Sequence, residues 1–298
     1  ASIEEALTAL RPVMDEIDGF EQSLNAGVHR DIANLFLRQQ PGLSLDELAR
    51  NIWPSLILNG EAAAGVAQAV ADHRAGALVR QGLAARYDAV NKLLDDGCMT
   101  LPERVQVGAD AILVVPTLAY YASVFADKVR PLENFTCVLE SGLLNEALYD
   151  AAVLVRLLND LGTQLLMNST DSRAEVLRSL RADGKGGESF YDLLRNAPEQ
   201  YRRWLTRIRK DLTHGEFNIS VYSLNYSTNA EMIDAFKDQL DYLSRFYMQT
   251  RAQLIARLHD MRSKLGDPTI SALLERFVAF HEKLYSNNYE EAEGEYAV

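Results

Sequence analysis

The stretch LVRLLNDLGTQLLMNST, residues 154–170, combines the leucine spacing of a helix with charged and amide side chains in its middle. One face carries leucines at helical steps: Leu154, Leu158, Leu161 and Leu165. The remaining faces are apolar as well, through Val153, Leu157 and Leu166. A helix that is apolar nearly all round is typical of a buried position. The stretch therefore predicts a helix inside a helical bundle, with Asn159 and Asp160 facing the interior.

Helical periodicity extends through most of the chain, and the strand–helix alternation of a parallel sheet is missing. Further helices are expected at about 60–97, 139–167, 190–214, 230–265 and 270–286. The segment Phe217–Asn229 has strand-like alternation with few charges, and is expected to be irregular. We predict a single all-α domain over residues 1–298, a multi-helix bundle around an apolar core or cavity. A flexible Gly-rich loop at 181–189 is where a subdomain boundary would fall.

The composition is that of a folded protein with an acidic surface: 48% of residues are hydrophobic, 24% are charged, and the net charge is −12. Such a chain is poorly suited to broad binding of nucleic acids. Cys98 and Cys137 form no CxxC pair, which fits a reducing cytoplasm. The apolar run 111–126 is short for a membrane span, and Pro116 predicts a buried, kinked helix there. We expect a cytoplasmic protein with no membrane span.

Oxygen-bearing side chains in the opening stretch are spaced to share one helix face. Asn159 and Thr163 lie four residues apart, so they project from the same side of the helix. Amide and hydroxyl oxygens, completed by water, are ligands that magnesium accepts. Arg156 lies one turn earlier and can point to the same place. The alternative is a buried polar patch in which Asp160 pairs with Arg156 or with a neighbouring helix.

The segment RLLNDLGT, Arg156–Thr163, resembles the second metal motif of class I terpene synthases. That motif has Asn or Asp, then Asp, and then Ser or Thr four positions after the first residue; its final Glu position is Met167 here. The resemblance implies an all-α bundle around an apolar cavity and magnesium-assisted loss of diphosphate from a prenyl diphosphate. Asn159 and Thr163 would hold the metal, and Arg156 and Asp160 would be catalytic.

The resemblance also implies a first acidic metal motif upstream, and two clusters are candidates for it. One is Asp95 with Asp96, and the other is Asp15 with Asp18. The implied partner is a small apolar or diphosphate-bearing substrate. Association as a homodimer is left open.

A basic cluster within residues 199–214 could bind the anionic part of a substrate. Arg203 and Arg207 lie one turn apart and could clamp a phosphate or a carboxylate. Aromatic residues are candidates for the apolar part of the site: Tyr222, Tyr226, Tyr242, Phe246 and Tyr247, with Tyr120 and Tyr121 elsewhere in the chain. The alternatives are a solvated helix face for the arginines and core packing for the aromatic residues.

Two further functions remain open from the residues alone. Asp211 and His214 share a helix face at i and i+3, which is how helical iron sites present ligands, and a haem would need only one axial histidine. An iron- or haem-dependent oxygenase or oxidase is therefore an alternative. A non-catalytic interaction protein, using a surface on the helix expected at 230–265, is another.

Overall fold

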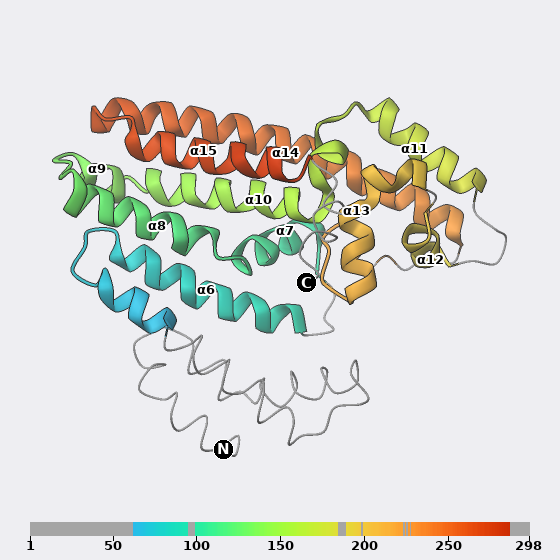
Figure 1. Ribbon diagram of the computed structural model, residues 1–298, viewed down its shortest axis with the longest axis horizontal. Helices are drawn as coiled ribbons and strands as arrows, with labels where there is room; N and C mark the ends of the chain where they lie inside the picture. The colour runs from blue at the N-terminus through green and yellow to red at the C-terminus, as the bar shows by residue number, and fades with distance from the viewer. Residues whose placement is uncertain are drawn as a thin grey trace, which may run out of the picture. The chain divides into compact units, whose positions relative to one another are not determined.

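The computed structural model describes residues 62–286, apart from 95–98, 184–188, 198, 223, 225 and 227. Every regular element in these ranges is a helix (Figure 1), so the all-α prediction is confirmed. No single helix of the described part is long and apolar enough to cross a membrane. One bent pair of helices, Leu101–Asp110 with Val114–Val129, has the length and composition for a membrane span, by these two criteria only. The chain divides into two compact units, each treated by itself below.

The first unit contains, among the described residues, 62–94 and Asp110–Leu148. Its elements are a helix at 62–69, α6 (Gly76–Leu94), α8 (Val114–Val124), the π-helical η1 (Phe125–Val129), α9 (Phe135–Glu140) and the first turns of α10 (Leu143–Met167). Helices α6 and α8 pack side by side (Figure 1). Their approach is close at Gly82, where a Cβ would lie 2.9 Å from Cδ of Pro116. Glycine at this position therefore sets how closely the two helices can pack.

Arg74 explains why the Ala-rich segment expected as one long helix is two helices with a turn between them. Its main-chain N–H and Nε donate to the carboxylate of Asp127 at 2.8 and 2.6 Å. Its terminal nitrogens donate to two backbone carbonyls at 2.8 and 2.9 Å. A Cβ on Gly76 would lie 2.0 Å from a carbonyl oxygen of this turn. The prediction of one continuous helix is wrong because helical periodicity does not register the distant partners of Arg74.

Pro116 produces no kink in α8, contrary to the expectation for the apolar run 111–126. The helix begins at Val114, so the proline lies in its first turn. Main-chain N–H groups in the first turn have no intrahelical acceptor, and the missing donor of proline is tolerated there. The irregular parts of this run lie on either side of the proline: a turn at 111–113 before α8 begins, and the π-helical turn from Phe125 after it ends.

The second unit contains residues 99–109 and the chain from Tyr149 onward. Its elements are α7 (Leu101–Asp110), most of α10, α11 (Thr170–Asp183), α12 (Phe190–Arg195), α13 (Glu199–His214), α14 (Asn229–Leu265) and α15 (Thr269–Leu284). Helix α14 is bounded by local signals: a capping box of Thr228 and Glu231 at its start, and Gly266 in the left-handed conformation, φ 63°, after its end. The expected boundaries of α14 and α15 are therefore confirmed closely.

Helices α10, α14 and α15 lie alongside one another in this unit (Figure 1). Ser244 of α14 donates to the carbonyl of Leu166 at the end of α10, at 2.6 Å. Glu282 of α15 accepts hydrogen bonds from Tyr247 and Arg251 of α14, each at 2.7 Å. The leucines of the opening stretch are buried here, as expected: Leu154, Leu157, Leu158, Leu161, Leu165 and Leu166.

Helix α11 is joined to α14 by a buried ion pair, in which Arg173 Nη2 lies 2.9 Å from Asp241 Oδ1. Arg173 also donates to the main-chain carbonyls of Leu165 and Asn168, so it holds the connection between α10 and α11. Helix α11 ends at Asp183, inside the loop expected at 181–189. Residues 184–188 of that loop lie outside the described part of the chain.

Candidate functional site

Asp160 is the centre of a buried polar network in the second unit. Its side chain is fully buried and lies 2.8 Å from Nη2 of Arg156, one turn earlier on α10. Its Oδ2 accepts the main-chain N–H of Ile219 at 2.8 Å. Burial raises the pKa of Asp160, while the charge of Arg156 and the bond from Ile219 act in the opposite direction. The expectation that Asp160 is buried with a partner is therefore confirmed.

Arg156 joins this network to the irregular segment after α13. Its Nη2 also donates to the carbonyl of Phe217 at 2.9 Å, and its guanidinium lies 5.3 Å from the centre of the Phe217 ring. Gly108 of α7 packs against the same side chain: a Cβ there would lie 3.2 Å from Nε of Arg156. The guanidinium is thus enclosed by structural neighbours on several sides.

Asn218 holds two carboxyl-bearing residues together. Its Nδ2 donates to the main-chain carbonyl of Asp160 at 2.8 Å and to Oδ2 of Asp211 at 2.7 Å. Burial, followed by the negative charge of Asp160, raises the pKa of Asp211 to about 7; the bond from Asn218 and the charges of Arg207 and Lys210 oppose this. Asp211 is therefore set to change its protonation near neutral pH.

Arg104 of α7 fixes the other end of the irregular segment, although nothing in the sequence marked it. It donates to the carbonyls of Ile219 and Tyr222 at 2.9 and 2.6 Å, and its side chain is buried. The Tyr191 hydroxyl donates to the carbonyl of Leu224 at 2.8 Å. Described residues of the segment expected to be irregular are therefore held by bonds to their backbone carbonyls, which side-chain patterns do not reveal.

Asn159 and Thr163, the predicted magnesium ligands, both have protein partners. Arg207 donates to the main-chain carbonyl and to Oδ1 of Asn159, at 2.7 and 2.6 Å. The Thr163 hydroxyl donates to the carbonyl of Glu282 at 2.6 Å. Asn159 is partly rather than fully buried. A metal ion here would have to replace these bonds beside the positive charge of Arg207, so the magnesium role stays a prediction.

Helix α10 breaks between these two residues. Gly162 has φ 77° and ψ 160°, which is not a helical conformation. The N–H of Thr163 donates to the carbonyl of Tyr285 at 3.2 Å. It therefore does not bond the carbonyl of Asn159 four residues back, as it would in a continuous helix. The guanidinium of Arg207, which lies over the Tyr285 ring at 4.9 Å, supplies the missing donor.

The remaining predicted site residues are not brought together. Arg203 belongs to α13, but its side chain lies outside the described part. Tyr222 is partly buried, Tyr226 is 50% exposed, and His214 is exposed three residues after the buried Asp211. The acidic candidates lie outside the described residues: Asp15, Asp18, Asp95 and Asp96.

The iron alternative also stays a prediction. Within the described residues, no group of three or more His, Cys, Asp or Glu side chains is placed to hold a metal ion. A visible absorption spectrum and iron analysis of protein produced in iron-rich medium would test this alternative and the haem alternative directly.

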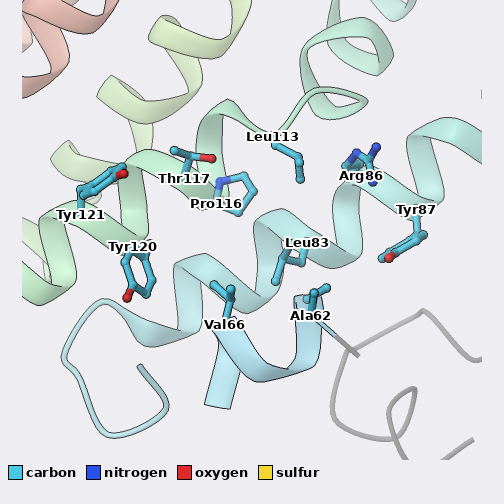
Figure 2. A pocket seen from close by; sticks show the side chains of 11 residues that line it. Ala62, Val66, Leu83, Arg86, Tyr87, Leu113, Pro116, Thr117, Tyr120 and Tyr121 are labelled. Carbon is cyan, nitrogen blue, oxygen red and sulfur yellow. The ribbon is translucent and has the colours of Figure 1, made fainter. Parts of the chain in front are cut away.

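A cavity of about 310 Å³ lies in the first unit, between the helix at 62–69, α6 and α8 (Figure 2). Its wall is mainly apolar and includes Leu83 and Pro116, which are both buried. Large apolar side chains on its rim are exposed: Val66 by 41%, Leu113 by 44% and Tyr121 by 54%. The cavity is thus an opening with an apolar lining and an apolar rim.

A few polar groups face this cavity from α6 and α8. Arg86 and Tyr87 come from α6, and Thr117, Tyr120 and Tyr121 from α8 (Figure 2). The rings of the last two meet edge to face, with their centres 5.8 Å apart. Burial raises the pKa of Tyr87, and the nearby charge of Arg86 opposes this rise. Aromatic rings and one cation therefore surround an apolar space.

The aromatic residues predicted to line an apolar pocket include two that line this cavity, Tyr120 and Tyr121. The other five do not line it, and Arg86 resembles any charged residue on an amphipathic helix. Comparison with known proteins adds nothing to the geometry, since no protein-family model, curated protein or solved structure matches the chain significantly.

Proposed function

We propose that the chain binds a small, largely apolar molecule in the cavity lined by α6, α8 and the helix at 62–69. The observation that carries the proposal is the grouping of Val66, Leu113 and Tyr121, all exposed by more than 40%, around an apolar opening. Exposed apolar side chains scattered singly are ordinary, but a cluster around a hollow is typical of a binding site.

The size of the cavity limits the ligand. Pockets for small molecules usually measure about 300–1,000 Å³, and the value here, about 310 Å³, lies at the lower end. Such a space suits up to three aromatic rings or a short alkyl chain. The cavity volume is compatible with the small apolar partner expected from the sequence. The longer prenyl chains would fit this volume only tightly.

The rigidity of the wall favours a site that is already formed before binding. Gly82 allows α6 to approach Pro116 closely, and Leu83 beside it is buried. Apolar surface in a preformed pocket needs little reorganisation to receive a ligand, so most of the free energy of burial is available for binding.

A neutral fluorescent probe tests the proposal. N-phenyl-1-naphthylamine, whose emission rises in apolar surroundings, should show a saturable increase with the 298-residue chain. Ala63→Phe, which places a ring into the cavity, should weaken this binding at least about tenfold, by excluded volume. Ala69→Phe, at an exposed position on the same helix outside the lining, is the matched control and should bind like the unmodified chain.

Two outcomes would contradict the proposal. One is the lack of a saturable increase in emission with the unmodified protein. The other is equal binding by Ala63→Phe and Ala69→Phe when thermal melts show that both variants are folded.

A further inference from the structure

We infer that the ligand of this cavity carries a single planar anionic group, a carboxylate or a close analogue, held by the guanidinium of Arg86. The inference rests on the proposed function, because it names the chemical class of a ligand for the same site. It is carried by the position and the unmet hydrogen-bonding capacity of one side chain.

Arg86 contributes to the cavity wall from the middle of α6 (Figure 2). Its Nε is buried, and this donor has no hydrogen-bond partner in the described part of the chain. Nε is also buried and without a partner in Arg104 and Arg156, but the terminal nitrogens of both donate to protein acceptors. The guanidinium of Arg86 differs from theirs because none of its nitrogens has a hydrogen-bond acceptor in the described part of the chain.

A buried N–H without an acceptor is unfavourable, and an arginine cannot avoid this by losing its proton. An acceptor supplied by a ligand would remove the penalty once the guanidinium turns toward the cavity, because Nε has almost no accessible surface in its present position. The guanidinium presents its donors in a flat fork whose spacing matches the two oxygens of a carboxylate. The chemistry of the unmet donor thus selects a planar anion with paired oxygens.

The remaining lining limits the charge of the ligand. Arg86 is the one Lys or Arg among the described residues that line the cavity, and these include no Asp or Glu. One cation balances one negative charge; a diphosphate would bring more charge than this lining can neutralise. The net charge of the whole chain, −12, also disfavours highly charged anions.

The apolar part of the ligand follows from the neighbours of Arg86. The ring of Tyr87 stands next to it on α6, and Leu83 lies one turn earlier on the same side of the cavity. Tyr120 and Tyr121 line the cavity from α8, with their rings edge to face against each other. Aromatic walls favour flat rings through stacked and edge-to-face contacts. The ligand class is therefore an aryl or short-chain alkyl carboxylic acid.

The test compares two probes of the same shape: the anionic 2-naphthoate and the uncharged 2-naphthamide, which has an NH₂ in place of one oxygen. Each is titrated calorimetrically into the 298-residue chain. The unmodified chain should bind the naphthoate at least about tenfold more tightly, the ratio expected of a charge-assisted bond over a neutral one. Arg86→Met should abolish this preference and leave the affinity for the naphthamide within about twofold. Arg86→Lys, which keeps the charge but loses the fork, should retain only part of the preference.

Lys92→Met is the matched control, because it removes one positive charge from an exposed position of the same helix, outside the lining. It should keep the full preference for the naphthoate. If thermal melts show that Arg86→Met does not fold, Arg86→Lys provides the test by itself. A preference for the naphthoate that is undiminished in Arg86→Lys would then overturn the inference.

The outcomes separate the two proposals. Equal affinity of the unmodified chain for both probes, or a preference that survives in Arg86→Met, would overturn the inference and leave the proposed function standing. Failure of the unmodified chain to bind either probe, or N-phenyl-1-naphthylamine, would overturn both.

Discussion

Arg207 donates to both oxygens of Asn159, to its main-chain carbonyl at 2.7 Å and to its side-chain Oδ1 at 2.6 Å. The main-chain bond replaces one that α10 loses at Gly162, where the N–H of Thr163 turns to Tyr285 instead. A side chain from α13 thus completes the backbone bonding of α10. This explains why polar residues stand in the middle of an otherwise apolar helix.

Replacement of Arg207 by Met should therefore destabilise the protein. It leaves the carbonyl of Asn159 without its donor in a partly buried place, at a cost of about 1–3 kcal/mol. Lys210→Met is the control: Lys210 lies on the same helix, and its ion pair with Glu216, after the helix end, is exposed. The loss of this pair should lower the free energy of unfolding by less than about 1 kcal/mol. Urea unfolding measures both. Equal losses of unfolding free energy in the two variants would show that the hydrogen bonds from Arg207 to Asn159 stabilise the protein no more than an exposed ion pair does.

Gly162→Ala should also destabilise the protein, by about 1–3 kcal/mol, because φ 77° with ψ 160° is a conformation that residues other than glycine avoid. A Cβ there would meet its nearest atom only at 3.4 Å, so the loss comes from the backbone rather than from a clash. Gly65→Ala, in the helix at 62–69 with nothing within 4 Å of a Cβ, should be neutral or slightly stabilising. Thermal melts of the two variants compare them directly. A Gly162→Ala melt unchanged from that of the unmodified chain would refute the argument.

Asp211 should make stability depend on pH between about 4 and about 7. Its folded pKa, about 7, lies above the ordinary 3.8, so over this range the folded chain keeps a proton that the unfolded chain has released. The free energy of unfolding therefore falls as pH rises through this window and levels off above it. Asp211→Asn removes the charge, and should be more stable than the unmodified chain at pH 8, on the order of 2 kcal/mol.

The advantage of Asp211→Asn should shrink toward pH 5, where Asp211 is protonated in the folded chain. Asp72→Asn, at an exposed turn, is the control and should show no such pH-dependent difference. Urea unfolding at several pH values between 5 and 8 provides the measurement. A difference that stays constant across this range would contradict the assigned direction.

The magnesium prediction has its own test, because it requires Asn159 and Thr163 to give up their present partners. It predicts that magnesium with inorganic diphosphate raises the melting temperature of the unmodified chain but not that of Asn159→Ala. Asn145→Ala, an exposed position on the same helix, is the control. Product analysis after incubation with farnesyl and geranylgeranyl diphosphates checks the catalytic part. Unchanged melting and no product would count against the terpene-synthase resemblance.

The parts of the fold that could be predicted depend on local signals. The capping box at Thr228 and the left-handed Gly266 mark the ends of α14, and both are readable in the sequence. The burial of Asp160 follows from the apolar surround of its helix, and its pairing with Arg156 follows from their spacing of one turn. Periodicity, caps and i, i+4 pairs each involve residues within a few positions of one another.

The parts that could not be predicted depend on residues far apart in the chain. The break at Gly162 is stable because Tyr285 and Arg207 meet it there, and neither leaves a mark in the surrounding sequence. The cavity exists because α6 and α8 converge at Gly82 and Pro116. The hydrogen bonding of Arg86 Nε likewise depends on how the helices pack, so the sequence alone does not predict that this donor lacks an acceptor.

The last turn of α15 has a consequence for shortened forms of the chain. Glu282 accepts bonds from Tyr247 and Arg251 through its carboxylate and from Thr163 through its carbonyl. Translation that stopped just before this residue would remove acceptors from three side chains on two other helices at once. Such a product should be cleared by cellular proteases more readily than the unmodified chain, so early termination here would act as a loss of the whole protein.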